Sequence, residues 1–263
     1  MTTMKIISKL FCLNNNAISD SNEAVFKVKE LYLEDPSNFF LVEIGANDGF
    51  CADRMWRFVN ENNPNALMVE PIPDYFFALT ENYKNLNNVR FENIALNDIE
   101  TTLTMTYIPR DVILSGMVRF RLENSPHLWS QHWAQGLGSF YPDRNNLGDP
   151  NLKKFQEKID VQTRTWSYII DKYEIKNYKN VVIQTDCEGH DLILLKNFPF
   201  EKVKPKMYFA EIYGKTRYPE SHPRYGEEIG LYSQKDENEA KEIFLKNGYI
   251  IHQFGDMLAV LKE

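Results

Sequence analysis

The chain has 263 residues, of which 43% are hydrophobic and 25% are charged. This balance is typical of a globular protein and excludes a largely disordered one. The formal net charge of −7 disfavours a nucleic-acid substrate, because phosphate backbones are usually bound by basic surfaces. No apolar run approaches the ~20 residues of a membrane span. The three cysteines lack metal-binding or disulfide spacing, so we expect a cytoplasmic protein.

The N-terminal part of the chain alternates between predicted helices and strands. An N-terminal arm and helix are expected over residues 1–38, with the helix beginning near Ser19, and a strand follows from Phe39. The next predicted elements are helices over about 51–61 and 74–83 and strands over 66–70 and 89–95. Such alternation predicts a parallel, doubly wound sheet.

The middle of the chain departs from this pattern, and we interpret about 101–165 as an insertion. Residues 101–108 alternate in polarity and predict a strand, with 161–166 as its antiparallel partner. The long connection between them is rich in Gly, Pro, Asn, Arg and aromatic residues, which is usual for functional or disordered segments. Its amphipathic centre, His127–Trp133, predicts a short helix in a lid, although its tryptophans could equally face the core.

Regular alternation resumes after the insertion and ends in a hairpin. The predicted elements are a helix from Thr165 or Ser167 to about 173, strands over 181–186 and 207–212, helices over about 190–197 and 237–247, and hairpin strands over 249–254 and 257–261. A loop dense in Tyr, Pro, Arg and His is expected between residues 216 and 234. Residues 39–263 are therefore expected to form one α/β domain.

The stretch Phe39–Phe50, FFLVEIGANDGF, predicts a cofactor site of the nucleoside type. A continuous apolar run enters a turn in which Gly45 and Gly49 allow a sharp bend and a close approach to a ligand. A second apolar run ends at Glu70, where a carboxylate can bind the hydroxyls of a ribose. The turn lacks the third glycine of the dinucleotide fingerprint, which favours S-adenosylmethionine over NAD.

Four segments carry a resemblance to the FkbM family of S-adenosylmethionine-dependent methyltransferases. They are VEIGANDG at 42–49, MVEPIPDYFFAL at 68–79, NIAL at 93–96, and residues 181–198 with their Asp-Cys-Glu-Gly motif. The resemblance covers roughly residues 39–100 and 160–212. It implies a Rossmann-like, seven-stranded class I methyltransferase sheet, mostly parallel with a C-terminal antiparallel hairpin, and a lid-like insertion. It also implies O-methylation of sugars in surface polysaccharides or of specialised metabolites.

The resemblance also implies which residues hold the cofactor. Glu70 is expected to bind the ribose, and Glu43 to reach the amino group through a water, unless it is a buried carboxylate that serves only the turn. The other expected cofactor residues are Gly45, Asn47 and Gly49 around the methionine part, Ile72 against the adenine, Asn93 and Ala95 at its border, and Asp186 near the amine.

Methyl transfer to a hydroxyl requires a positioned acceptor and a group that removes its proton. Asp186 is the strongest candidate, and Glu188 either orients a neighbour or caps the next helix. Glu211 ends the next strand as a base or as a partner for a basic side chain. His190 is a weaker candidate, because a helix N-terminus disfavours the imidazolium form. Histidines of the irregular segments could join Asp186 and Glu211 around a metal, but their spacing is unspecific and no metal is predicted.

Basic side chains concentrate in the irregular segments of this acidic chain, where they can pair with phosphate or carboxylate. The predicted acceptor is a sugar or small molecule, phosphorylated or nucleotide-linked in one hypothesis, while solvated surface charge is the alternative. Candidate acceptor-binding residues are Ser139, Tyr213, Arg217, His222 and Arg224. Rival functions are methylation of another oxygen or nitrogen, such as a phosphate or phosphoramidate, an NAD-type oxidoreductase, and a non-catalytic S-adenosylmethionine-binding module.

Overall fold

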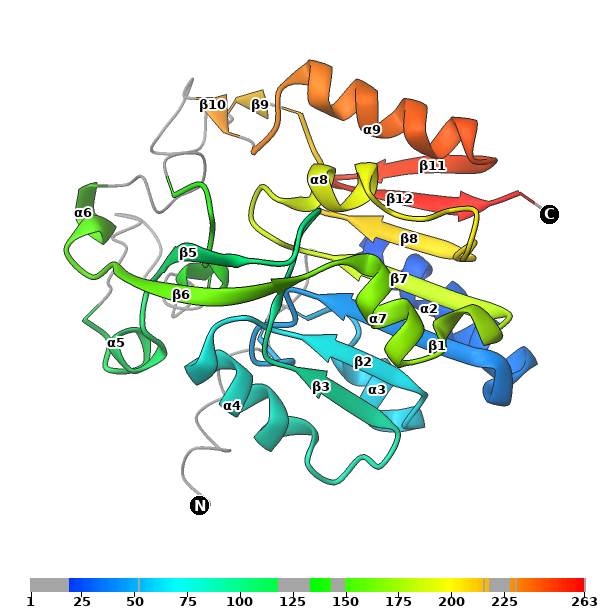
Figure 1. The fold of residues 1–263 in the computed structure, drawn as a ribbon, viewed down its shortest axis with the longest axis horizontal. Coiled ribbons are helices and arrows are strands. Elements are labelled where there is room, and N and C mark those ends of the chain that lie inside the picture. The colour runs from blue at the N-terminus through cyan, green and yellow to red at the C-terminus, as the bar shows by residue number, and fades with distance from the viewer. Residues whose placement is uncertain are drawn as a thin grey trace.

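The computed structural model describes residues 19–51, 53–117, 133–142, 150–214, 216–217, 228–229 and 231–262. A seven-stranded sheet with the order β11-β12-β8-β7-β1-β2-β3 forms its centre (Figure 1). Its strands are β1 (Phe39–Ile44), β2 (Ala66–Val69), β3 (Val89–Glu92), β7 (Asn180–Thr185), β8 (Met207–Ala210), β11 (Tyr249–Phe254) and β12 (Asp256–Leu261). β12 is antiparallel to both of its neighbours, whereas β1, β2, β3, β7 and β8 pair in parallel. The predicted sheet with its terminal antiparallel hairpin is confirmed.

Within the described part of the chain, three helices pack on each face of this sheet. One face carries α2 (Ser19–Glu34), α3 (Trp56–Asn62) and α4 (Pro73–Tyr83), and the other carries α7 (Trp166–Lys172), α8 (Asp191–Lys196) and α9 (Gln234–Lys246). Adjacent residues of β1 alternate between the two cores: Leu41 packs with the first set of helices, and Phe40 and Val42 pack with the second. Because the central strands are buried on both faces, they read as continuous apolar runs. Short 3-10 turns are η1 (Pro36–Asn38) and η5 (Ile175–Asn177).

The insertion and the short strand before it form a smaller sheet beside the carboxyl ends of the central strands (Figure 1). Its strands are β4 (Ala95–Leu96), β5 (Thr102–Tyr107) and β6 (Glu157–Arg164), and its described helical turns are α5 (Arg110–Leu114), η3 (Trp133–Gly136) and α6 (Pro150–Lys153). β5 and β6 are antiparallel, as predicted. The Tyr75 hydroxyl donates to the Ile108 carbonyl at 2.8 Å, which ties α4 to the insertion. Residues 127–132 of the predicted lid helix lie outside the described residues.

Two predicted element boundaries are wrong for reasons that the structure makes clear. The helix expected from about residue 51 begins at Trp56, because the carboxylates of Asp48 and Asp53 accept the N–H groups of the intervening backbone and hold it as a turn. The strand expected over 89–95 ends at Glu92, and Ala95–Leu96 pair with β6 instead. The Asn93 amide donates to the Glu70 and Pro71 carbonyls at 2.8 and 3.0 Å. Asn93 therefore anchors the chain where it leaves the central sheet and enters the smaller one.

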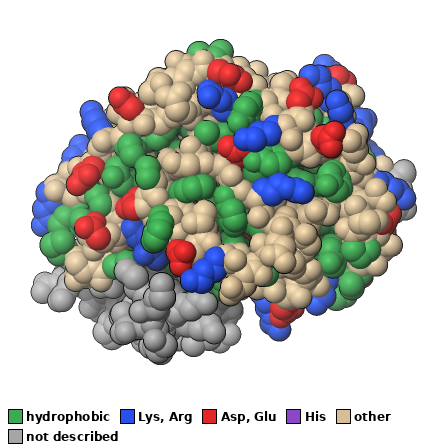
Figure 2. All heavy atoms as spheres, turned by 60° about the horizontal axis from the view of Figure 1, so that its bottom comes forward, with side chains coloured by type: hydrophobic (Ala, Val, Ile, Leu, Met, Phe, Trp, Pro, Cys, Tyr) green, Lys and Arg blue, Asp and Glu red, His purple; other side chains and the backbone are tan. Residues whose placement is uncertain are grey.

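Smaller differences occur towards the C-terminus. α9 begins at Gln234 because Ser233 and Asp236 form a capping box in front of it. Within the expected loop, β9 (Thr216–Arg217) pairs with β10 (Glu228–Ile229). Among the described residues, none of the helices has the length and apolar character that crossing a membrane would need. Acidic and basic side chains are interspersed across the face in Figure 2.

Gly49→Ala should destabilise the fold more than a positive φ angle alone explains. Gly49 has φ +66°, and an added Cβ would lie 2.5 Å from side-chain atoms of both Leu79 and Tyr83. Gly248 has φ +91° with nothing within 4 Å, so Gly248→Ala isolates the backbone cost of about 1–2 kcal/mol. Overpacking against α4 should add about 1–3 kcal/mol for Gly49→Ala. Urea unfolding measures both, and equal losses would contradict the close packing.

Candidate functional site

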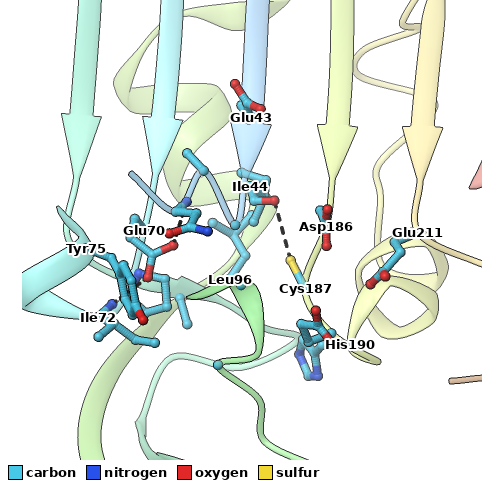
Figure 3. Close-up of a pocket in the computed structure, with 18 of the residues that line it drawn as sticks. Glu43, Ile44, Glu70, Ile72, Tyr75, Leu96, Asp186, Cys187, His190 and Glu211 are labelled. Atoms are coloured by element: carbon cyan, nitrogen blue, oxygen red, sulfur yellow. Dashed lines mark hydrogen bonds between the residues drawn. The ribbon is translucent and has the colours of Figure 1, made fainter. Parts of the chain in front are cut away.

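A cavity of about 240 Å³ lies at the carboxyl ends of the central strands (Figure 3). Its inner wall is formed by the turn after β1, the end of β2 and the loop 186–190 after β7. Residues 135–140 of the insertion form its outer wall, together with Met105 of β5. Open parallel sheets bind their ligands at this edge. Figure 3 places Glu70, Ile72 and Tyr75 at one end of the cavity and Asp186 and Glu211 at the other.

The turn after β1 depends on the missing side chain of Gly45. A Cβ there would lie 1.9 Å from the backbone oxygen of Asp186, so only glycine lets the turn approach the loop after β7. Asn47 also has a left-handed backbone, with φ +52°. Its side-chain Oδ1 is buried without a hydrogen-bond partner among the described residues, and Asn47 lines the cavity. Gly49 does not line the cavity but packs against α4.

Glu70 is held at the cavity by the backbone. Its Oε2 accepts the Asn47 N–H at 2.9 Å and its Oε1 accepts the Ile72 N–H at 2.8 Å. Burial raises the pKa of Glu70 to about 7, although these two hydrogen bonds oppose the shift. Ile72 and Ala95 line an apolar part of the cavity beside Glu70, whereas Asn93 does not line it. A carboxylate beside an apolar slot suits a ribose with an attached flat ring.

A buried polar pair lies between β1 and β7. The parallel register sets Glu43 opposite Gln184, and the Gln184 amide donates to Glu43 Oε1. The other Glu43 oxygen and the Gln184 oxygen are buried without a partner, although these residues are only 2% and 6% exposed. Burial, and then the nearby Asp53, raise the pKa of Glu43 well above its ordinary value. The Gln184 oxygen has no donor among the described residues and is available to a ligand N–H or O–H group. Glu43 offers its second oxygen beside it when ionised, and can donate to Asp53 when protonated.

Three carboxyl groups meet at the other end of the cavity. Oxygens of Asp186, Glu188 and Glu211 all lie within 4.8 Å of one another. The surrounding protein, and then Asp256, raise the pKa of Asp186 to about 6, although its side chain stays open to the cavity. Burial and the neighbouring Asp186 raise the pKa of Glu211 well above its ordinary value. Carboxyls this close either share a proton or ligate a divalent cation.

His190 connects the loop after β7 to the insertion through both ring nitrogens. Nε2 lies 3.1 Å from the Asn97 side-chain oxygen, and Nδ1 lies 3.2 Å from the Tyr141 hydroxyl. Because the Asn97 oxygen can only accept, Nε2 carries the proton and Nδ1 accepts from Tyr141. Burial lowers the pKa of His190 to about 4, so the ring is neutral near pH 7. With both nitrogens engaged, a role as base is less favoured by the geometry than a role in holding the loop.

The structure describes only some of the candidate acceptor-binding residues. The Ser139 hydroxyl donates to the Glu188 carbonyl at 2.7 Å and accepts the Tyr141 N–H at 2.9 Å, so it holds the loop and does not line the cavity. Tyr213 follows β8, and burial raises its pKa. The Arg217 side chain, His222 and Arg224 lie outside the described residues. These acceptor assignments remain predictions.

Sequence reasoning missed four polar residues of the site. Asp53, Gln135 and Gln184 line the cavity, and the Asp48 carboxylate lies directly behind it. Gln184 could have been identified from the sequence, because a polar residue inside an apolar parallel strand is buried and needs a hydrogen-bond partner. Asp48 and Asp53 resembled ordinary turn residues, and Gln135 lies in a segment without periodicity.

Comparison with known families gives one match. A family model described as "Methyltransferase FkbM domain" matches residues 43–263. The match spans the central sheet from within β1 onward, the insertion and the C-terminal hairpin. No curated protein and no solved structure matches the chain.

Glu43→Gln should flatten the pH dependence of stability. Because the folded state raises the pKa of Glu43 above its ordinary 4.5, the unfolded chain releases this proton first as the pH rises. The folded state therefore loses stability above about pH 4.5, and a glutamine removes that loss. Relative to wild type, the variant should gain free energy of unfolding between pH 4.5 and 8 in urea titrations. Exposed Glu61→Gln should show no such gain; a parallel gain in both variants would refute the assignment to burial.

Proposed function

Since the chain belongs to the FkbM family of methyltransferases, we propose that it takes its methyl group from S-adenosylmethionine. The observation that carries this proposal is the charge of the cavity. Its acidic lining residues are Glu43, Asp53, Glu70, Asp186, Glu188 and Glu211, and none of the described lining residues is a lysine or an arginine. S-adenosylmethionine presents a sulfonium and an ammonium against one carboxylate, so its net positive charge matches this lining. The two phosphates of NAD would be repelled.

The described residues match the parts of this donor one by one. Each Glu70 oxygen accepts one backbone N–H and keeps a lone pair for a ribose hydroxyl. The apolar slot of Ile72 and Ala95 suits the adenine. The unpartnered oxygens of Glu43 and Gln184 suit the ammonium group. The backbone from Gly45 to Asn47 would border the methionine part.

We further propose that the acceptor atom is a hydroxyl oxygen. The donor would supply an electrophilic methyl group: its methyl–sulfur bond would break and release S-adenosylhomocysteine as the new C–O bond forms, and the acceptor must lose its proton. Asp186, with a pKa near 6, is ionised at neutral pH and open to the cavity. Glu211 keeps its proton to higher pH and prevents the three carboxyls from repelling one another. Asp186 is therefore the proposed base, and Glu188 and Glu211 are the neighbouring carboxyl groups proposed to keep its side chain in position.

The proposed acceptor is a sugar or small metabolite, such as a precursor of a surface polysaccharide. A phosphorylated or nucleotide-linked form would use Arg217 and Arg224, in keeping with the basic residues of that segment. Methylation of a phosphate or phosphoramidate remains the alternative acceptor chemistry. A panel of hydroxylated acceptors with and without phosphate distinguishes these classes, and donor binding without any transfer would indicate a non-catalytic module.

Glu70→Ala should weaken the binding of S-adenosylmethionine and S-adenosylhomocysteine by at least about tenfold, because hydrogen bonds to a charged group are lost. Isothermal titration calorimetry measures both ligands and NAD, and wild type should bind the first two and not NAD. Glu92→Ala is the matched control, since Glu92 ends the neighbouring strand but contacts Lys172 and Tyr173 outside the cavity. Tight NAD binding, or equal effects of both variants, would overturn the donor assignment.

Asp186→Asn should lower kcat by about 100-fold or more, because a general base is lost. In wild type, kcat should rise with pH through about 6 as Asp186 ionises. Transfer of a labelled methyl group to the acceptor panel measures both effects. Asp160→Asn, on the exposed side of β6, should leave kcat and its pH profile unchanged. Full activity of Asp186→Asn would eliminate Asp186 as the base.

A further inference from the structure

The insertion touches the turn after β1 through a buried hydrogen bond. The Gln135 amide donates to Asp48 Oδ2 at 2.6 Å, between residues that are 87 positions apart in the sequence. Both side chains are almost fully buried, at 3% and 2% exposure. Gln135 also lines the cavity, so the same residue borders the proposed donor site and contacts Asp48.

The Asp48 carboxylate holds the turn with its second oxygen. Oδ1 accepts the Phe50 N–H at 3.1 Å and the Cys51 N–H at 2.8 Å. The Asp48 carbonyl accepts the Asn82 amide at 2.8 Å, which adds a contact to α4. The Asp48 side chain therefore fixes the shape of the turn and also accepts the hydrogen bond from the insertion. Any movement of Gln135 changes the surroundings of both oxygens.

Two glycines of the outer wall, which is formed by residues 135–140, lie close to residues proposed to bind the methyl donor. A Cβ on Gly138 would lie 2.4 Å from Ile72 Cδ1, and a Cβ on Gly136 would lie 3.7 Å from Asn47 Nδ2. Arg110 adds its guanidinium 3.5 Å from Asp48 Oδ2, and the Arg110 N–H donates to Asp74 at 2.8 Å. The wall and the turn thus form one connected surface around the cavity.

We propose that Asp48 and Gln135 are positioning residues of the donor site. Gln135 fixes the insertion as the outer wall of the cavity through its bond to Asp48. Asp48 in turn holds the turn after β1, in which the Asn47 N–H donates to Glu70. The donor's identity here rests on the proposed function. Because Gln135 lines the cavity, breaking its bond to Asp48 would loosen the wall around a bound donor, so this bond controls the dissociation rate more than the association rate.

Gln135→Glu tests this proposal by placing two carboxylates against each other. Stopped-flow fluorescence with S-adenosylhomocysteine should show dissociation at least about tenfold faster, with association changed much less, because a hydrogen bond to a charged group becomes a repulsion. Gln162→Glu is the matched control on the same insertion, where the exposed amide contacts only Thr102 among its described hydrogen bonds. It should leave both rates unchanged.

The double variant Asp48→Asn with Gln135→Glu reverses the direction of the bond. The new asparagine oxygen can still accept the Phe50 and Cys51 N–H groups, while its NH₂ donates to the new glutamate. Dissociation should return to within about threefold of wild type, a smaller change than the single charged substitution causes. A lower melting temperature with unchanged dissociation, or a failure of the double variant to restore the rate in a folded protein, would overturn the positioning role.

A ligand-free measurement separates this inference from the identity of the donor. Amide hydrogen exchange at Phe50 and Cys51 should accelerate in Gln135→Glu and recover in the double variant. If wild type binds no S-adenosylhomocysteine, the donor proposal fails, and the exchange data still decide whether Asp48 and Gln135 are coupled. Unchanged exchange at both amides would refute the coupling.

Discussion

The ends of the central strands hold more carboxyl groups than the described positive charges can balance. Glu43 lies one residue before the end of β1, and Glu70, Asp186 and Glu211 follow the strands beside it; desolvation by the surrounding protein raises the pKa of each. Arg54, whose charge acts on Glu43 and Asp186, is paired with Asp256 and does not line the cavity. Protons bound by the carboxyls with raised pKa values neutralise part of this charge, and a cationic ligand such as the proposed donor would favour their ionised forms. The proposed chemistry of the site depends on this arrangement of carboxyl groups.

The fold and the strand-end chemistry were both accessible from the sequence. Periodicity predicted the parallel sheet and the terminal hairpin, because strands buried on both faces must be apolar throughout. The same reasoning predicted Glu70 and Asp186, since a polar residue that ends such a strand lies at the ligand-binding edge. The start of α3 was missed because Asp48 and Asp53 hold the backbone through side chains, which a periodic pattern does not record.

Resemblance to the family pointed to residues 136–140 as neighbours of the cofactor, but the hydrogen bonds that hold this outer wall in place were not accessible to sequence reasoning. Gly136–Phe140 lie against the turn after β1, but that contact depends on hydrogen bonds that span much of the chain. The orientation of His190 likewise depends on Asn97 and Tyr141, which come from different parts of the chain. Local patterns identify residues capable of chemistry, whereas the tertiary structure decides which of their atoms remain available.

The place of β12 has a consequence for how the protein is made. Arg54 lies beside the cofactor turn, yet its partner Asp256 is 202 residues further along the chain. β12 also inserts between β8 and β11, so the sheet stays open until this strand arrives. During synthesis, the turn after β1 emerges long before its charge partner. Until β12 pairs with it, β8 presents an unpaired edge, so the C-terminal strand both completes the sheet and supplies the partner of Arg54.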